Sequence, residues 1–279
     1  MKKIQVKDLP EKVFDEIFGA IWPYSIGLVA VTECSSGEDA LLMGSGTLIR
    51  VGDTKGILTA YHVVSSDRYR KARYLGLDFL SHIHRFIADK EYVKIVEVAK
   101  PREPSIGPDL AVIILPDVKI PWVEATKRFW DISLRRHDVL PNPVDRDIGL
   151  WCLVGFPDEF TRMEDPRPGF NNVKGFCNMF GWSGVQREWF DGEYDYLDIS
   201  VLYEDDIALP VSFGGVSGGG IWQIPLLESG DGVIESKEPI FSGVAFYETA
   251  IEDKKRCIRG HGRSSVYETV YKKLKDNTV

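Results

Sequence analysis

The sequence predicts an all-β protein, built as a barrel or a sandwich, with one helix at each end. Short runs rich in β-branched and aromatic residues follow one another from residue 25 to residue 247, separated by Gly, Pro, Asp and Ser. Many short strands between turn signals are typical of barrels and sandwiches rather than of alternating strand–helix units. Apolar residues at helical spacing are found at the two ends.

The first helix is expected directly after Pro10, which suits a helix start, and Pro23 ends its pattern. One apolar stripe at helical spacing holds Val13, Phe14, Ile17, Phe18 and Ile21. We expect this helix to pack against the body of the fold; docking a partner is the alternative. The last helix is expected over Ser264–Lys275, where Val266, Val270 and Leu274 repeat at a spacing of four.

Strands are expected between these helices. The runs that predict them are Ile26–Thr32, Leu41–Arg50, Gly56–Ala60, Tyr92–Val98, Asp109–Leu115, Gly149–Gly155, Tyr196–Tyr203, Gly220–Ile224 and Pro239–Tyr247. The weakest strand signal lies between Phe160 and Asp195, a segment rich in aromatic residues and glycine. Such a composition is too aromatic for disorder, so it predicts ordered loops or hairpins.

Composition and charge indicate which kinds of binding partner and which cell compartment to expect. The net charge is −8 and the pI is near 5.3, which argues against a nucleic-acid partner, because phosphate binding needs a cationic surface. No apolar stretch reaches the roughly 18 residues of a spanning helix, so no membrane segment is expected. The start, Met1-Lys2-Lys3, lacks the apolar run of a signal peptide, and the four cysteines are widely spaced without C-x-x-C. We therefore predict a cytoplasmic protein with free thiols.

Three segments hold groups suited to acyl transfer, which needs a nucleophile, a base, a group that orients the base, and oxyanion donors. In the first segment, the strand Gly44–Ile49, a turn and the strand Gly56–Ala60 lead to His62. In the second, Asp109 heads the apolar run Leu110–Leu115. A carboxylate at the mouth of a buried strand is placed to accept a hydrogen bond from an imidazole.

The third segment is Phe213–Trp222, which contains G-x-S-G-G with Ser217 as its serine. Its glycines permit the unusual dihedrals of a tight turn and the close approach of a substrate backbone. The order along the chain is His, Asp, Ser, which differs from the Ser, Asp, His order of α/β-hydrolases. Asp206 fits the pattern around Asp109, but it lies only eleven residues before Ser217, so we interpret it as an ordinary loop or strand carboxylate.

Together these segments resemble the chymotrypsin/trypsin-like serine peptidases, and in particular their compact bacterial-type members without a zymogen switch. The family's histidine string reads L-T-A-A-H-x-V, from which only Tyr61 departs in Leu58–Val64. The resemblance spans Ser25–Tyr247 and implies two six-stranded antiparallel β-barrels, no metal and no cofactor. It also implies roles: Ser217 as nucleophile, His62 as base, Asp109 as its orienting group, and the N–H groups of Gly215 and Ser217 as the oxyanion hole.

The expected organisation is a helical extension at 1–24, a first barrel at 25–130 with His62 and Asp109, a second barrel at 131–263 with Ser217, and a helix at 264–279. An aromatic insertion at 158–195 is expected within the second barrel.

Departures from the family concern control and specificity. Val216 stands where digestive relatives have the aspartate of their activation switch, so we hypothesise control by an activating protein partner. The resemblance places the substrate pocket at Val211, Ser212, Phe213, Phe246 and Tyr247. With no acid at Val211, we predict an uncharged substrate side chain before the cleaved bond, although Glu248 would favour basic ones if it formed a negative rim.

The prediction is thus a serine endopeptidase acting on proteins or peptides. Two alternatives remain open: a catalytically silent member that binds peptides as a scaffold, and an esterase with the same triad. His82 and His84 stand two residues apart without a third ligand nearby, so we interpret them as structural rather than metal-binding. His137 and His261 belong to no motif.

Overall fold

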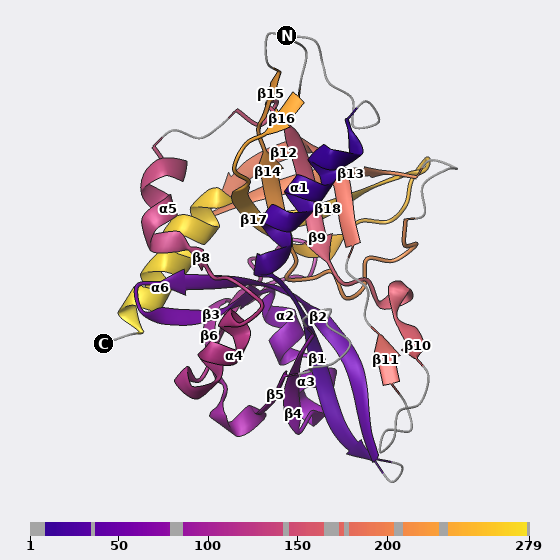
Figure 1. Ribbon diagram of the computed structural model, residues 1–279, viewed down its shortest axis with the longest axis vertical. Coiled ribbons are helices and arrows are strands. Elements are labelled where there is room, and N and C mark those ends of the chain that lie inside the picture. The colour runs from indigo at the N-terminus through magenta and orange to yellow at the C-terminus, as the bar shows by residue number, and fades with distance from the viewer. Residues whose placement is uncertain are drawn as a thin grey trace.

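An eight-stranded sheet and a closed six-stranded barrel make up the body of the computed structural model (Figure 1). The structure describes residues 9–34, 37–78, 86–141, 145–164, 173–175, 179–203, 209–228 and 234–277. The predicted all-β fold with terminal helices is confirmed. One detail differs: among the described residues the first unit is an open curved sheet, where six strands in a closed barrel were expected.

The open sheet has the strand order β5-β4-β1-β2-β3-β7-β6, and β8 adds to it by pairing in parallel with β2. All other pairings in it are antiparallel. Its strands are β1 (Ser25–Cys34), β2 (Gly37–Val51), β3 (Thr54–Thr59), β4 (Tyr74–Asp78), β5 (Phe86–Asp89), β6 (Lys94–Ala99), β7 (Leu110–Ile114) and β8 (Trp130–Asp131).

The closed barrel has the order β12-β13-β18-β17-β14-β9. Its strands are β9 (Leu150–Gly155), β12 (Met179–Asp191), β13 (Tyr194–Leu202), β14 (Gly220–Ile224), β17 (Ile240–Glu248) and β18 (Lys255–His261). Two small hairpins extend from it, formed by β10 (Arg162–Glu164) with β11 (Val173–Gly175) and by β15 (Leu226–Glu228) with β16 (Ile234–Ser236).

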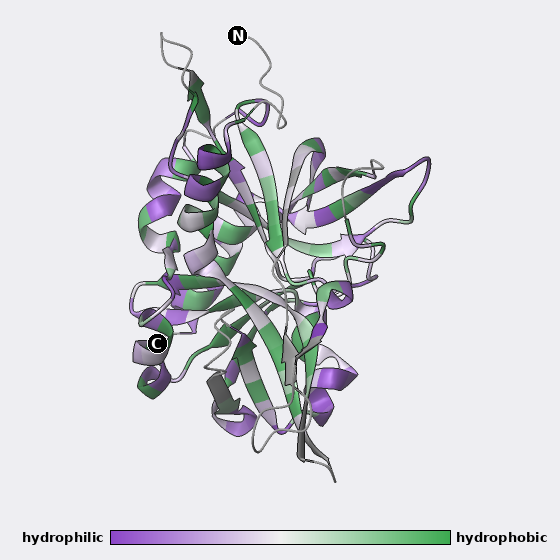
Figure 2. Ribbon diagram, turned by 45° about the vertical axis from the view of Figure 1, so that its right-hand side comes forward, coloured by the Kyte–Doolittle hydropathy of each residue, from purple (hydrophilic) through white to green (hydrophobic). Residues whose placement is uncertain are grey.

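Helices lie on the outside of both units. They are α1 (Glu11–Ile21), α2 (Tyr61–Ser65), α3 (Asp67–Lys71), α4 (Ile120–Glu124), α5 (Ile132–Val139) and α6 (Tyr271–Asp276), the last continuing a π-helical turn over Ser265–Val270. Val13, Ile17 and Ile21 of α1 are buried, so this helix packs against the body as expected. Figure 2 shows hydrophobic residues gathered along the strands, whereas the helices carry many hydrophilic positions.

A shared core joins the two units. Trp130 at β8 packs edge-on against Trp222 of β14, and Tyr24 contacts both rings. The Trp130 indole N–H donates to the Tyr267 hydroxyl at 2.9 Å, and this hydroxyl donates to the Phe241 carbonyl at 2.9 Å. The C-terminal turn thus ties the open sheet to the barrel.

Part of the expected insertion belongs to the barrel. The strand β12 pairs with β9 on one side and with β13 on the other, although Gly181 and Gly184 weaken its strand pattern. Partners distant in the sequence therefore decide its conformation. Helices α2 to α5 were not expected, because segments of five to eight residues are too short to show helical periodicity.

Within the described part of the chain, none of the helices combines the length and the apolar composition needed to cross a bilayer.

Candidate active site

His62 and Asp109 are in direct contact. His62 lies on α2, directly after β3, and Asp109 immediately precedes β7, which pairs with β3. One Asp109 oxygen is 2.6 Å from His62 Nδ1, and the other accepts the His62 main-chain N–H at 2.9 Å. A carboxylate accepts hydrogen bonds only, so Nδ1 carries the proton and Nε2 is left as a base. The His62 side chain is 44% exposed, while that of Asp109 is buried.

A second histidine supports Asp109 from behind. The Asp109 main-chain N–H donates to His261 Nε2 at 2.9 Å, which requires that Nε2 be unprotonated. His261 is fully buried against Tyr196 and Phe246, and burial lowers its pKa to about 3. It is therefore neutral at pH 7. The sequence offered no signal for this role, because β18 brings His261 to Asp109 from a distant part of the chain.

The predicted nucleophile follows a tight turn. The Val216 N–H donates to the Phe213 carbonyl at 2.9 Å, and Gly215 has φ +89°. Gly214, at the second position, is not among the glycines with positive φ, so the turn is of type II, whereas a type I turn would have a negative φ at Gly215 and a flipped central peptide. The Gly214 carbonyl accepts the Asp158 N–H at 2.7 Å. Since the N–H of a trans peptide points opposite to its carbonyl, the Gly215 N–H faces away from Asp158.

Ser45 binds this turn to the open sheet, a role that the sequence alone did not predict. Its N–H donates to the Ser217 carbonyl at 2.8 Å, and its hydroxyl donates to the Gly215 carbonyl at 2.7 Å. The same hydroxyl accepts the Phe156 N–H at 2.8 Å. Ser45 is fully buried, so these bonds fix both residues expected to supply oxyanion donors. The small-residue pattern around Ser45 was its only signal.

The turn before Ser217 and α2, the helix that carries His62, both lie against Gly44. A Cβ there would lie 2.7 Å from a Val63 methyl carbon and 2.9 Å from the Ser217 carbonyl oxygen. Ser217 is therefore packed beside the residue that follows His62. Gly218 has φ +88°, and a Cβ there would lie 2.1 Å from the Ser45 carbonyl oxygen, so only glycine fits.

A cavity of about 150 Å³ opens beside Ser217. It is lined by Phe213, Gly214, Val216, Ser217, Ala245, Phe246, Tyr247, Glu248 and Ile258. The cavity thus brings together Phe213, Phe246 and Tyr247 of the predicted pocket. It does not include Val211, which is 67% exposed, or Ser212, which is also exposed.

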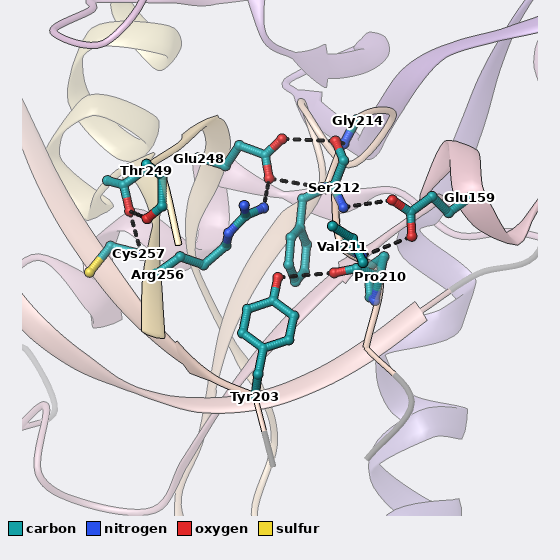
Figure 3. A network of polar contacts seen from close by, with 12 residues as sticks. Glu159, Tyr203, Pro210, Val211, Ser212, Gly214, Glu248, Thr249, Arg256 and Cys257 are labelled. Carbon is teal, nitrogen blue, oxygen red and sulfur yellow. Dashed lines mark hydrogen bonds and ion pairs between the residues drawn. The ribbon is translucent and has the colours of Figure 1, made fainter. Parts of the chain in front are cut away.

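Val211 and Ser212 have another partner. Both main-chain N–H groups donate to the Glu159 carboxylate, at 2.8 and 2.7 Å, and the Tyr203 hydroxyl donates to the Pro210 carbonyl at 3.0 Å (Figure 3). These contacts hold the chain that leads into the nucleophile turn.

A larger cavity, of about 570 Å³, lies at an end of the barrel between Trp151, Trp189 and Arg263. Its lining includes none of the predicted site residues, so we assign the site to the smaller cavity beside Ser217. No group of three or more His, Cys, Asp or Glu side chains is placed to hold a metal ion within the described ranges. His82, His84 and Asp206 lie outside the described residues.

Comparison with known proteins yields structural likeness only. No protein-family model matches the sequence, and no curated protein does. Among the solved structures that match is the Rv3671c protease from M. tuberculosis in its active form, at 14% identity and a TM-score of 0.47, over 90% of this chain and 81% of that chain. Another is the HtrA-type protease AlgW with a decapeptide, at 12% identity and a TM-score of 0.48, over 94% and 67%.

A third structure concerns the intrinsically disordered Sesbania mosaic virus VPg protein, whose coupled folding and binding are driven by aromatic interactions. It shares 14% identity and a TM-score of 0.42 over 88% of this chain and 89% of that chain. The strand pairing of the chain itself gives an all-β fold, with an open eight-stranded sheet and a closed six-stranded barrel.

Proposed function

We propose that the protein is a serine endopeptidase that cleaves peptide bonds in protein or peptide substrates, with Ser217, His62 and Asp109 as its triad. One observation carries the proposal: the buried Asp109 carboxylate binds both the ring and the main chain of His62. This arrangement leaves Nε2 as the proton acceptor that a serine nucleophile needs.

In the proposed reaction, Ser217 Oγ attacks the substrate carbonyl while His62 Nε2 takes its proton. His62 then gives this proton to the leaving amine, and the resulting acyl-enzyme is hydrolysed by water in the same way. Asp109 stabilises the imidazolium that forms in each step. The N–H groups of Gly215 and Ser217 would bind the oxyanion, and a type II turn held by Ser45 and the Asp158 N–H supports this assignment.

Control and location are part of the proposal. Val216 is buried and apolar, so the turn lacks the aspartate that an activation switch of the digestive type would use. We propose that a protein partner controls the enzyme in the cytoplasm, where Cys152 and Cys257 remain free thiols, as they are in the structure. Rapid digestion of unfolded casein by the purified protein alone would contradict partner control.

The test is hydrolysis of a peptide library, followed by mass spectrometry. The purified wild type should cut internal amide bonds, slowly as long as its controlling partner is absent. Ser217→Ala should lose about 10⁶-fold in kcat, and Asp109→Asn about 10⁴-fold because the wrong tautomer is favoured. Cleavage of esters without amides would support the esterase instead, and peptide binding without cleavage would support the scaffold.

A further inference from the structure

Glu248, at the end of β17, lines the cavity beside Ser217, and its carboxylate is already occupied. One oxygen accepts the Ser212 hydroxyl at 2.9 Å. The other accepts the Phe213 N–H at 2.9 Å and an Arg256 guanidinium N–H. Figure 3 shows the Glu248 carboxylate between Ser212 and the Arg256 guanidinium. The Glu248 carboxylate therefore does not form a free negative rim that would favour basic substrates.

Arg256, on β18, lies directly behind the cavity wall. Its guanidinium carbon is 5.8 Å from the ring centre of Phe213, a residue that lines the cavity, and 5.8 Å from that of Tyr203. Its side chain is only 8% exposed, against 31% for Glu248. Within the described part of the chain, its buried Nε has no hydrogen-bond partner. The charge of Arg256 is thus held near the cavity chiefly by Glu248.

Apart from Ser217 and Tyr247, which carry hydroxyl groups, the remaining lining is apolar or backbone. Val216, Ala245, Phe246 and Ile258 present hydrocarbon, and among the described residues Glu248 is the only charged side chain of the lining. A charged substrate side chain would lose its hydration here and would meet two opposite charges that already neutralise each other. An uncharged, apolar side chain has no such cost.

We propose that the Glu248–Arg256 pair determines the specificity of this cavity: paired, the two residues select an apolar side chain before the cleaved bond (P1), and each residue alone would select the opposite charge. This inference rests on the proposed function and extends it to the substrate class. In Glu248→Gln the uncompensated guanidinium favours an acidic P1 residue. In Arg256→Met, which retains an apolar stem, the free carboxylate favours a basic one.

The experiment measures kcat/KM for three peptides that differ only at P1, with Leu, Lys or Glu. The wild type should prefer Leu over both charged peptides by about tenfold or more. Glu248→Gln should raise the Glu-to-Lys ratio about tenfold, and Arg256→Met should lower it by a similar factor. The double variant Glu248→Gln/Arg256→Met is the matched control, because it has no net charge and should return to the wild-type order.

Labelling of Ser217 with an uncharged fluorophosphonate separates the two proposals. Absence of labelling in folded wild type would refute the triad, whereas labelling with P1 ratios that do not change in the variants would refute only this inference. Thermal melting shows which variants fold. If a single variant does not fold, the other variant and the wild-type profile decide: a wild type that prefers Lys or Glu to Leu overturns the proposal.

Discussion

Replacing Ser45 with alanine removes one hydroxyl that holds the nucleophile turn. This hydroxyl donates to the Gly215 carbonyl at 2.7 Å and accepts the Phe156 N–H at 2.8 Å. Phe156 is fully buried, so water does not replace the bond that its N–H loses, and the Gly215 carbonyl lies in a half-buried residue. Each buried polar group left without a partner costs about 1–3 kcal/mol. We expect the free energy of unfolding to fall by about 2–4 kcal/mol.

The substitution should also act on catalysis, because the Gly215 peptide is expected to supply an oxyanion donor. Loss of an oxyanion donor lowers kcat by about 10²–10³-fold. Ser45 acts through Gly215, and the Asp158 N–H still holds the Gly214 carbonyl at 2.7 Å, so a smaller loss of about tenfold is expected. KM should change little, because the ground-state substrate does not use this donor.

Two assays test this expectation: urea unfolding, and steady-state hydrolysis of a peptide amide that the wild type cleaves. Ser25→Ala is the matched control, since Ser25 is also buried but its hydroxyl has no partner within the described residues. A Ser45→Ala variant that lost stability but kept kcat would refute the positioning role. A variant with neither effect would refute the hydrogen bonds themselves.

Three further predictions concern buried groups. His261 has a pKa of about 3 in the folded protein, below its unfolded value near 6.5. Between pH 6.5 and pH 3 the folded state therefore binds fewer protons than the unfolded state. The free energy of unfolding consequently falls as the pH drops through this range. From pH 6.5 to 5 the wild type should lose about 2 kcal/mol more than His261→Gln, as acid-range urea unfolding would show; equal losses would contradict this. Burial likewise lowers the pKa of Lys127 from 10.5 to about 6, so its neutral folded form gains stability as pH rises from 6 to 10.5. Relative to Lys127→Met, the wild type should gain up to about 1.4 kcal/mol per pH unit between pH 7 and 9, and parallel profiles would argue against it. Gly218→Ala should destabilise by about 2 kcal/mol or more in thermal melts, whereas Gly19→Ala, which meets no atom within 4 Å on α1, should not.

Much of the site follows from local sequence. The string before His62, the apolar run after Asp109 and the glycines around Ser217 each encode their own conformation, and the structure brings His62 and Asp109 into contact. The strand Gly220–Ile224 was predicted with its observed bounds, because turn residues and an apolar run mark it on both sides.

Contacts between distant segments could not be predicted. His261 accepts a bond from Asp109, 152 residues earlier, and Ser45 donates to Gly215, 170 residues later. Neither residue type is unusual in its local context, so only the packing of the barrel on the sheet reveals these roles. The position of Arg256 behind Glu248 likewise depends on how β17 pairs with β18.

The most direct test of the proposed triad is labelling with a fluorescent fluorophosphonate, which reacts with an activated serine. We expect the wild type to be labelled at Ser217, and folded Ser217→Ala and His62→Ala variants to remain unlabelled. Labelling that persists in Ser217→Ala, or a well-folded wild type that remains unlabelled, would contradict the assignment of Ser217 as the nucleophile.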